Sequence, residues 1–191
     1  AGHPARTLKI AEEDRKQWRM LQLLTAKPVL YVCNVEEASA ASGNSQSDRV
    51  AAMAASQGAA SVVISARIEE EISQLAEDEA VMFLEEMGLH EAGLDRLIKA
   101  GHALLGLQTY FTAGVKEVRA WTIPVGATAP QAAGVIHTDF EKGFIRAETI
   151  AYDDFIKFKG EQGAKDAGKL RVEGKDYVVK DGDVLHFRFN V

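Results

Sequence analysis

Residues 119–148 decide the fold of the second half of the chain and read Arg-Ala-Trp-Thr-Ile-Pro-Val-Gly-Ala-Thr-Ala-Pro-Gln-Ala-Ala-Gly-Val-Ile-His-Thr-Asp-Phe-Glu-Lys-Gly-Phe-Ile-Arg-Ala-Glu. The alternation of apolar and polar residues in Val118–Ile123 predicts a half-buried strand. The Gly, Pro and His-Thr-Asp residues that follow predict turns around a short helix. The stretch therefore indicates a compact module with unusual loops, and nothing in it resembles a catalytic nucleophile.

The sequence around this stretch predicts a small mixed sheet wrapped on one helix. A second helix is expected over residues 152–167, and Asp181-Gly182-Asp183 is typical of a turn before a last strand. The further expected strands are Phe144–Ile150, Leu170–Val172, Tyr177–Val179 and Val184–Phe189.

The first half of the chain contains the pattern of a βαβ unit. Val29–Cys33 and Val62–Ile64 are continuous apolar runs, which predict buried parallel strands. The Ala-rich segment Ser47–Gln57 between them predicts the connecting helix. Because ligands of such sheets bind at the carboxyl ends of the strands, we expect a binding site at residues 34–37 and 65–66.

Amphipathic patterns predict four other helices in the first half. They cover residues 12–24, 68–75, 81–87 and 94–105, with Gly88 as a helix cap. We expect their apolar stripes to lie in the core and the acidic groups 69–71 and 77–79 to face solvent.

Composition and charge exclude several classes of protein. The 191 residues are 47% hydrophobic, and no apolar run approaches the roughly 20 residues of a membrane span. A single cysteine, Cys33, fits a reducing compartment, and we expect a cytoplasmic protein. Residues 1–106 carry a net charge of −6 and residues 107–191 a net charge of 0, which argues against binding nucleic acid through bulk charge but leaves local basic patches open.

Six short motifs occur in a fixed order along the chain. They are residues 23–37, Ser65-Ala66, residues 110–114, 118–123 and 137–143, and the ending Phe187-Arg188-Phe189-Asn190-Val191. In this order they resemble the YchF family, also called Obg-like ATPases, over essentially the whole chain. The resemblance implies a P-loop nucleotidase of the TRAFAC class, of which this sequence would be the C-terminal portion.

The resemblance also implies a fold class, α/β plus α+β, and a division into three segments. Residues 1–25 would be the end of a helical coiled-coil insertion, and residues 26–106 the C-terminal part of the nucleotide-binding domain. Residues 107–191 would be a TGS domain with the β-grasp, ubiquitin-like fold.

The segment Asn34-Val35-Glu36-Glu37 corresponds to the base-recognition motif Asn-Lys-x-Asp of related GTPases. In those proteins the Asp carboxylate accepts hydrogen bonds from N1–H and the exocyclic amine of guanine. Here Val35 replaces the Lys, and the carboxylate of Glu37 lies one methylene farther out, so the guanine-specific geometry is lost. The resemblance implies adenine binding, with Asn34 and the Val35 backbone near the base, Glu37 in the motif, and Ser65-Ala66 closing the pocket. Taken alone, so short a pattern also fits an asparagine that merely caps a strand end.

The phosphate-binding part of a nucleotide site is missing. The pattern G-x-x-x-x-G-K-[ST] is approximated by residues 163–170, but Leu170 has no oxygen for Mg²⁺ and the segment runs from a helix into a strand. We therefore expect a helix-ending loop there. In the family the phosphate loop and the Mg²⁺ ligands lie upstream, so we expect this chain alone not to hydrolyse ATP.

The histidines offer no metal-binding spacing. His3, His90, His102, His137 and His186 match neither HxxxH nor HExxH, so we expect no metal site in the chain. We interpret His102 as part of a packed helix and His137 as a hydrogen-bonding loop residue. Ser65, His137 and Asp139 have the residue types of a catalytic triad, but no nucleophile-elbow motif surrounds the serine.

Two functions follow as hypotheses. In the first, the intact protein is a ribosome-associated ATPase that prefers ATP to GTP, with the ribosome or a ribosomal subunit as partner and no binding of membrane or DNA. In the second, the chain is a non-catalytic module whose TGS domain binds RNA or protein. A basic, partly aromatic surface at Arg119, Trp121, Lys142, Phe144 and Arg146 would suit RNA, although Trp121 and Phe144 are residue types that such sheets commonly bury.

Overall fold

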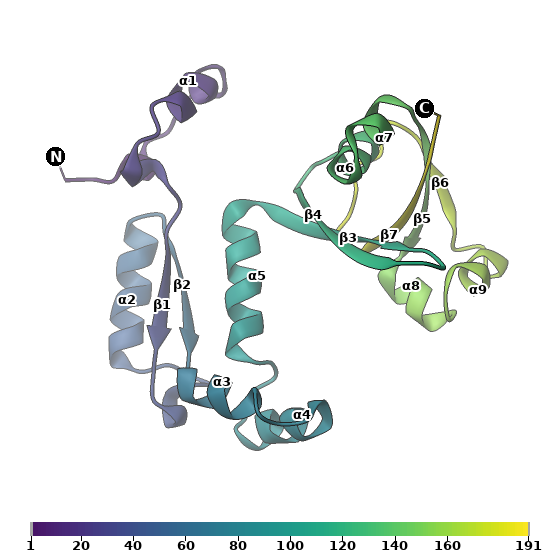
Figure 1. Ribbon diagram of the computed structural model, residues 1–191. Coiled ribbons are helices and arrows are strands. Elements are labelled where there is room, and N and C mark those ends of the chain that lie inside the picture. The colour runs from purple at the N-terminus through teal and green to yellow at the C-terminus, as the bar shows by residue number, and fades with distance from the viewer. Residues whose placement is uncertain (1, 191) are drawn as a thin grey trace. The chain divides into compact units, whose positions relative to one another are not determined.

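The computed structural model describes residues 2–190, which divide into two compact units, one up to Leu105 and one from Gly106 (Figure 1). Ala1, the first residue of the expected segment 1–25, and Val191, the last residue of the expected segment 107–191, lie outside the described residues. Within the described part, no helix is both long and apolar enough to cross a membrane.

The first unit is built on the predicted βαβ unit. Strands β1 (Leu30–Asn34) and β2 (Ala60–Ile64) are parallel, and helix α2 (Ser45–Ser56) connects them. The prediction that both strands are buried is wrong, since Val32 keeps 45% of its surface exposed. The physical reason is that a strand buries its side chains against elements packed on the sheet faces, and this sheet of two strands offers little surface for such packing within the described residues.

The remaining elements of the first unit are short helices, apart from α5. They are η1 (Ala5–Thr7), η2 (Glu12–Asp14), α1 (Arg15–Met20), η3 (Leu24–Ala26), η4 (Glu37–Ser39), α3 (Ala66–Ile72), α4 (Glu77–Glu86) and α5 (Gly93–Leu105). The helix expected over residues 12–24 is shorter, because Gln22 adopts φ 47°, which helical backbone does not allow.

The apolar stripe of α5 is only partly buried. Leu97 and Leu104 are half-buried, whereas Leu94, Ile98 and Leu105 are exposed. The prediction that the whole stripe lies in the core is therefore wrong. The core of this unit is small and centres on Ala40, Ile68 and Leu89.

The second unit is a five-stranded mixed sheet in the order β4-β3-β7-β5-β6. Its strands are β3 (Leu107–Ala113), β4 (Val118–Pro124), β5 (Phe144–Ala151), β6 (Arg171–Glu173) and β7 (Asp183–Phe189), and its helices are α6 (Ala129–Ile136), α7 (Thr138–Lys142), α8 (Tyr152–Lys157) and α9 (Glu161–Asp166). The central strands β3 and β7 are parallel, with Phe111 opposite Val184, and the other neighbouring pairs are antiparallel.

The core of this unit lies between the sheet and α6, as predicted for a sheet wrapped on a helix. Ala129, Ala132 and Ala133 of α6 are fully buried, and their small side chains let the helix approach the sheet closely. The buried Tyr110 donates its hydroxyl proton to the carbonyl oxygen of Ala132, 2.9 Å away.

Three predictions for this unit are wrong in detail. Strand β3 was not expected, and residues 177–179 form no strand but a single bridge between Val178 and Thr128. The helix expected over residues 152–167 is two helices, because Lys159 and Gly160 both have positive φ, at 60° and 115°. A positive φ breaks a right-handed helix.

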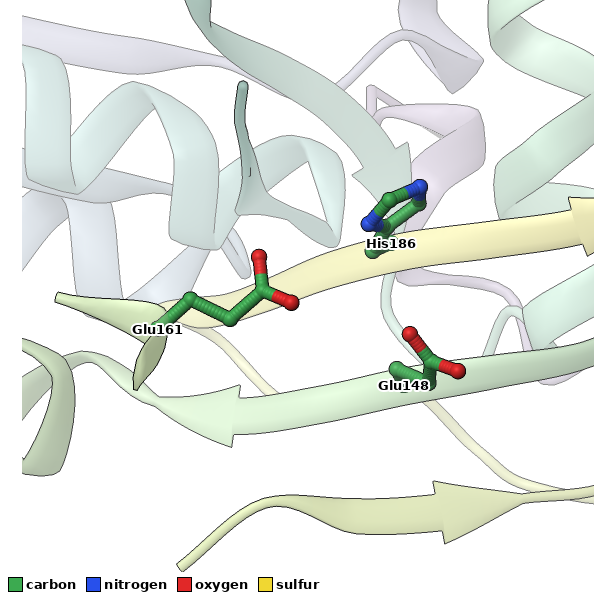
Figure 2. Close-up of side chains that lie close together, drawn as sticks. All are labelled: Glu148, Glu161 and His186. Carbon is green, nitrogen blue, oxygen red and sulfur yellow. The ribbon is translucent and has the colours of Figure 1, made fainter. Parts of the chain in front are cut away.

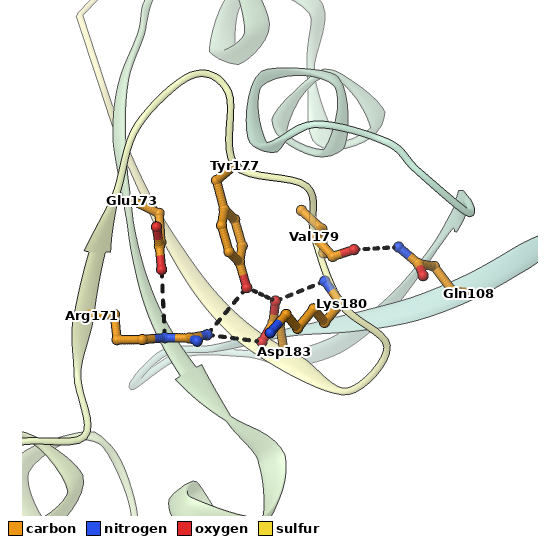
Figure 3. A network of polar contacts seen from close by, with 7 residues as sticks. All are labelled: Gln108, Arg171, Glu173, Tyr177, Val179, Lys180 and Asp183. Atoms are coloured by element: carbon orange, nitrogen blue, oxygen red, sulfur yellow. Dashed lines mark hydrogen bonds and ion pairs between the residues drawn. The ribbon is translucent and has the colours of Figure 1, made fainter.

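A polar network fixes the segment between β6 and β7 (Figure 3). The buried carboxylate of Asp183 accepts hydrogen bonds from the Tyr177 hydroxyl at 2.7 Å and from the backbone N–H of Lys180 at 2.9 Å. The Arg171 guanidinium lies 3.5 Å from the same carboxylate and 3.6 Å from that of Glu173. The loop is thereby tied to both strands that flank it.

Candidate functional site at the ends of two parallel strands

The register of β1 and β2 brings the two predicted binding segments together. Asn34, the last residue of β1, lies opposite Ile64, the last residue of β2. Because the strands are parallel, residues 34–37 and 65–66 leave the sheet at the same edge, beside α3 (Figure 1). The sequence prediction that these segments are neighbours is confirmed by this register.

Two hydrogen bonds join the segments. The backbone N–H of Val35 donates to the carbonyl oxygen of Ile64 at 2.9 Å, and the Ala66 N–H donates to Oδ1 of Asn34 at 2.9 Å. The Asn34 amide is thus held by its oxygen, which leaves its Nδ2 group, with two N–H donors, unpaired among residues 2–190. Asn34 is exposed, so these donors are available to a ligand.

One carboxylate oxygen of Glu37 is already paired. Its Oε1 atom lies 2.7 Å from Nε of Arg67, which also lies 3.7 Å from Glu71. Sequence reasoning missed Arg67, although a signal was present. Glu37 and Arg67 each follow a paired strand end, Asn34 or Ile64, by three residues, so the register alone places them side by side.

Glu36, also missed, organises the loop after β1. Its carboxylate accepts hydrogen bonds from the Ser39 hydroxyl at 2.5 Å and from Nδ2 of Asn44 at 3.2 Å. These bonds, with one from its own backbone N–H, lower the pKa of Glu36 below its ordinary value. Asn44 in turn caps α2, since its Oδ1 accepts from the N–H groups of Gln46 and Ser47, each at 3.0 Å.

Ser65 is almost completely buried, at 2% exposure, and its hydroxyl has no hydrogen-bond partner within the described residues. It precedes α3 at the position of a helix cap without capping it. An unpaired buried hydroxyl is costly in a folded protein and is a feature that functional sites retain.

A recess of about 270 Å³ lies along the end of β1 and the start of α2. Asn34 and Val35 line it together with Asn44 and Ser47, whereas Glu37, Ser65 and Ala66 lie outside its lining. The structure therefore joins all five predicted residues at one sheet edge but places only two of them on this recess.

The other segments singled out in the sequence behave differently. Residues 163–170 form the end of α9 and the loop before β6, as expected, and not a phosphate loop. His137 caps α7 by accepting from the Asp139 N–H at 3.2 Å, which confirms its interpretation as a hydrogen-bonding residue.

The candidate RNA surface is only partly available. Arg119 lies over the Trp121 ring, 4.3 Å from its centroid, and Trp121 is half-buried with its Nε1–H donating to Thr112 at 2.9 Å. Phe144 is 4% exposed and belongs to the core, so it cannot stack on a base.

Comparison with known proteins identifies relatives of both units. Residues 107–190 match the family model described as "YchF-GTPase_C: Protein of unknown function (DUF933)". The chain is 59% identical over 186 residues to "Ribosome-binding ATPase YchF" of Haemophilus influenzae and 56% identical over 190 residues to the protein of that name from Bacillus subtilis. These alignments cover 97% and 98% of the chain but 51% and 52% of the relatives, so the chain spans about half the length of the curated relatives that it matches.

A solved structure shows the same arrangement of elements. The "Structure of the Schizosaccharomyces pombe YchF GTPase" superposes with a TM-score of 0.81 at 36% sequence identity, covering 97% of the chain and 50% of that protein. Its title names a GTPase where the curated relatives are named ATPases, so the base specificity of the site is the point that needs an experiment.

Proposed function

The chain belongs to the YchF family, and we propose that it supplies the base-recognition half of a nucleotide site and the C-terminal domain of a ribosome-binding ATPase. In this proposal residues 1–25 end a helical insertion, residues 26–106 complete a P-loop nucleotide-binding domain, and residues 107–191 form a TGS domain of the β-grasp fold. The mixed sheet with parallel central strands and a helix packed on its face supports the last assignment.

The observation that carries the preference for adenine is the ion pair between Glu37 and Arg67. Guanine presents two donors, N1–H and the exocyclic amine, which a free carboxylate would accept. Here Oε1 of that carboxylate lies 2.7 Å from Nε of Arg67, so guanine would have to compete with the guanidinium for one of the two oxygens that its two donors need. The base edge of adenine presents one donor and one acceptor and does not need that carboxylate.

Asn34 provides the positive part of the recognition. Its Oδ1 is held by the Ala66 N–H, which fixes the direction of the amide, and the two Nδ2 donors suit the ring nitrogens of adenine. Val35 contributes a half-buried apolar side chain where a related GTPase carries the aliphatic stem and charge of a lysine. In this proposal Ser65 and Ala66, which lie next to the recess and not on its lining, border the base from the neighbouring strand.

Hydrolysis is assigned to residues that this sequence does not contain. Mg²⁺ supplies charge neutralisation at the β- and γ-phosphates in such enzymes, and its ligands are expected outside this chain. Within residues 34–66 the chain's own part is to orient the base and hence the nucleotide. We therefore expect ATP hydrolysis, ribosome binding and a cytoplasmic location for the intact protein and no hydrolysis by this chain alone.

The test compares nucleotide affinities in the intact protein that contains this sequence. With fluorescent ATP and GTP analogues, we expect tighter binding of ATP. Asn34→Ala should weaken ATP binding about five- to tenfold, because one hydrogen bond contributes about 1–1.5 kcal/mol. Asn190→Ala, an exposed asparagine in the other unit, is the matched control. Equal affinity for ATP and GTP, or an Asn34→Ala variant that binds ATP like the control, would refute the base-reading role.

A second candidate function is a non-catalytic TGS module that binds RNA or protein. The exposed Arg119 over the half-buried Trp121 is the observation that favours it, since this pair offers charge and an aromatic edge on one strand. An Arg119→Ala variant that loses ribosome binding while its ATP affinity stays unchanged would assign the contact to this surface.

A further inference from the structure

Three potential metal ligands lie close together on one face of the second unit, although no spacing motif in the sequence predicts a metal site there. Glu148 of β5, Glu161 of α9 and His186 of β7 each place a ligand atom within 4.8 Å of the other two (Figure 2). Because the three residues come from separate elements, their sequence separations carry no recognisable metal signature.

The fold explains why these residues meet. Glu148 and His186 are direct partners across the antiparallel pair of β5 and β7, so both side chains leave the same face of the sheet. The turn at Lys159 and Gly160, where both residues have positive φ, starts α9 so that its first residue, Glu161, reaches over these strands.

The space between the three side chains is of the size of a single ion or water. A hollow of about 10 Å³ lies among them, and its remaining walls are apolar, including Phe155 and Leu170 of the segment above the sheet. Apolar walls around charged ligands lower the local dielectric and strengthen their attraction for a cation.

The partners of the three residues leave ligand atoms available. Within residues 2–190, neither Glu161 nor His186 has a hydrogen bond or ion pair through its side chain, whereas Glu148 Oε2 accepts from Arg188 at 2.9 Å. The second oxygen of Glu148 lies 3.6 Å from Arg146, a longer and weaker contact. Arg188 would therefore orient Glu148 from outside while the other oxygen turns to a metal, in the manner of a carboxylate held by a hydrogen-bonded neighbour.

We propose that Glu148, Glu161 and His186 form a zinc-binding site on the TGS-like unit, with water as the fourth ligand. Two carboxylate oxygens and one imidazole nitrogen are a donor set that zinc accepts, whereas Mg²⁺ prefers oxygen ligands alone. Tetrahedral zinc with bonds of about 2.0–2.2 Å needs ligand atoms about 3.4 Å apart, which side-chain rotation reaches from the observed separations. The site is independent of the nucleotide pocket of the first unit.

The test is a calorimetric titration of the full chain with zinc chloride, with magnesium chloride as the comparison metal. We expect one zinc per chain, affinity for zinc at least tenfold above that for magnesium, and loss of binding in His186→Ala. Glu161→Gln should weaken zinc binding about tenfold or more. His3→Ala, an exposed histidine in the other unit, is the matched control and should bind zinc like the wild type.

A crystal or solution structure of the zinc complex provides the second measurement. Anomalous diffraction at the zinc edge should place the ion among the three side chains, and the His186 ring resonances should shift on titration. Retention of full affinity in His186→Ala, equal affinity for magnesium, or an ion located elsewhere would overturn the proposal. Circular dichroism of each variant separates lost binding from lost folding.

Discussion

Replacing Asp183 with asparagine should destabilise the second unit by about 3 kcal/mol. The 2% exposed carboxylate accepts hydrogen bonds from the Tyr177 hydroxyl and the Lys180 N–H, at 2.7 and 2.9 Å, and lies 3.5 Å from Arg171. Hydrogen bonds to a charged group contribute about 1.5–3 kcal/mol each. Both short bonds end on Oδ2, so the single oxygen of asparagine keeps them only as weaker bonds to a neutral acceptor. Its NH₂ group takes the place of Oδ1 and faces the Arg171 guanidinium, a donor against a donor, and the charge that compensated Arg171 is lost.

Urea unfolding followed by circular dichroism measures this loss. With a slope of about 1.5 kcal/mol per molar urea, the transition that reports on the second unit should move down by about 2 M. Asp176→Asn is the matched control, since Asp176 is exposed in the same loop, and it should stay within about 0.5 kcal/mol of the wild type. Tyr177→Phe should lie between them, with a loss of about 1.5–2 kcal/mol, since it removes one hydrogen bond to the carboxylate.

An Asp183→Asn variant as stable as Asp176→Asn would refute the reasoning. It would mean that the network in Figure 3 is replaced by equivalent bonds to water and does not hold the loop. A large loss in Tyr177→Phe with none in Asp183→Asn would assign the stability to the tyrosine ring instead.

Three further predictions concern packing, pH and a helix cap. Gly163→Ala should destabilise the protein by about 1–3 kcal/mol in thermal unfolding, because a Cβ atom there would collide with the carbonyl oxygen of Phe158, whereas Gly174→Ala has open space and should be neutral. Burial, together with the hydrogen bond to Asp183, raises the pKa of Tyr177 to about 12. The stability that depends on its protonated form is therefore complete below pH 10 and should be lost between pH 10 and 12. In an alkaline denaturation series, Tyr177→Phe should reduce this loss. Asn44→Ala should cost about 1 kcal/mol in urea unfolding, since it removes the cap of α2, and an unchanged midpoint would show that the cap is dispensable.

The regular parts of the fold were predictable from local sequence. The apolar runs at 29–33 and 62–64 and the Ala-rich helix between them gave the βαβ unit, because their periodicity reflects contacts within the unit. Strand β3 was missed, although it is the central partner of β4 and β7. Only Gly106 separates its residues 107–113 from α5, and this glycine, at φ 62°, is a helix-ending signal that the sequence analysis did not use.

Breaks in the elements were harder to predict because they depend on single backbone angles. Lys159 is a good helix former by propensity, yet it adopts φ 60° before Gly160 so that α8 and α9 can fold back on the sheet. The Gly160 N–H donates to the carbonyl oxygen of Phe155 at 2.8 Å, as in a Schellman-type helix end, so Gly160 was the local signal for this turn and Lys159 was not.

The sequence predicted which segments form the candidate nucleotide site but not which of their side chains interact. Parallel strands fix where residues 34–37 and 65–66 meet, which the sequence indicated. The ion pair between Glu37 and Arg67 depends on the register of β1 against β2. The cluster of Glu148, Glu161 and His186 depends on a cross-strand pair and on the residue at which α9 begins. Such contacts between distant residues become visible only once the strands are aligned.

The parallel pairing of β3 with β7 has a consequence for how the second unit folds. Phe111 and Val184 meet across 72 residues of intervening chain, while the β3–β4 hairpin needs only the short loop at 114–117. Closing the longer loop costs more entropy and delays the contact. Until β7 enters, the β3–β4 ribbon and the β5–β6 ribbon each present an unpaired edge to solvent, and an unpaired edge can capture another copy. Insertion of β7, the middle strand of the finished sheet, therefore ends the stage of folding in which the chain is most prone to aggregate.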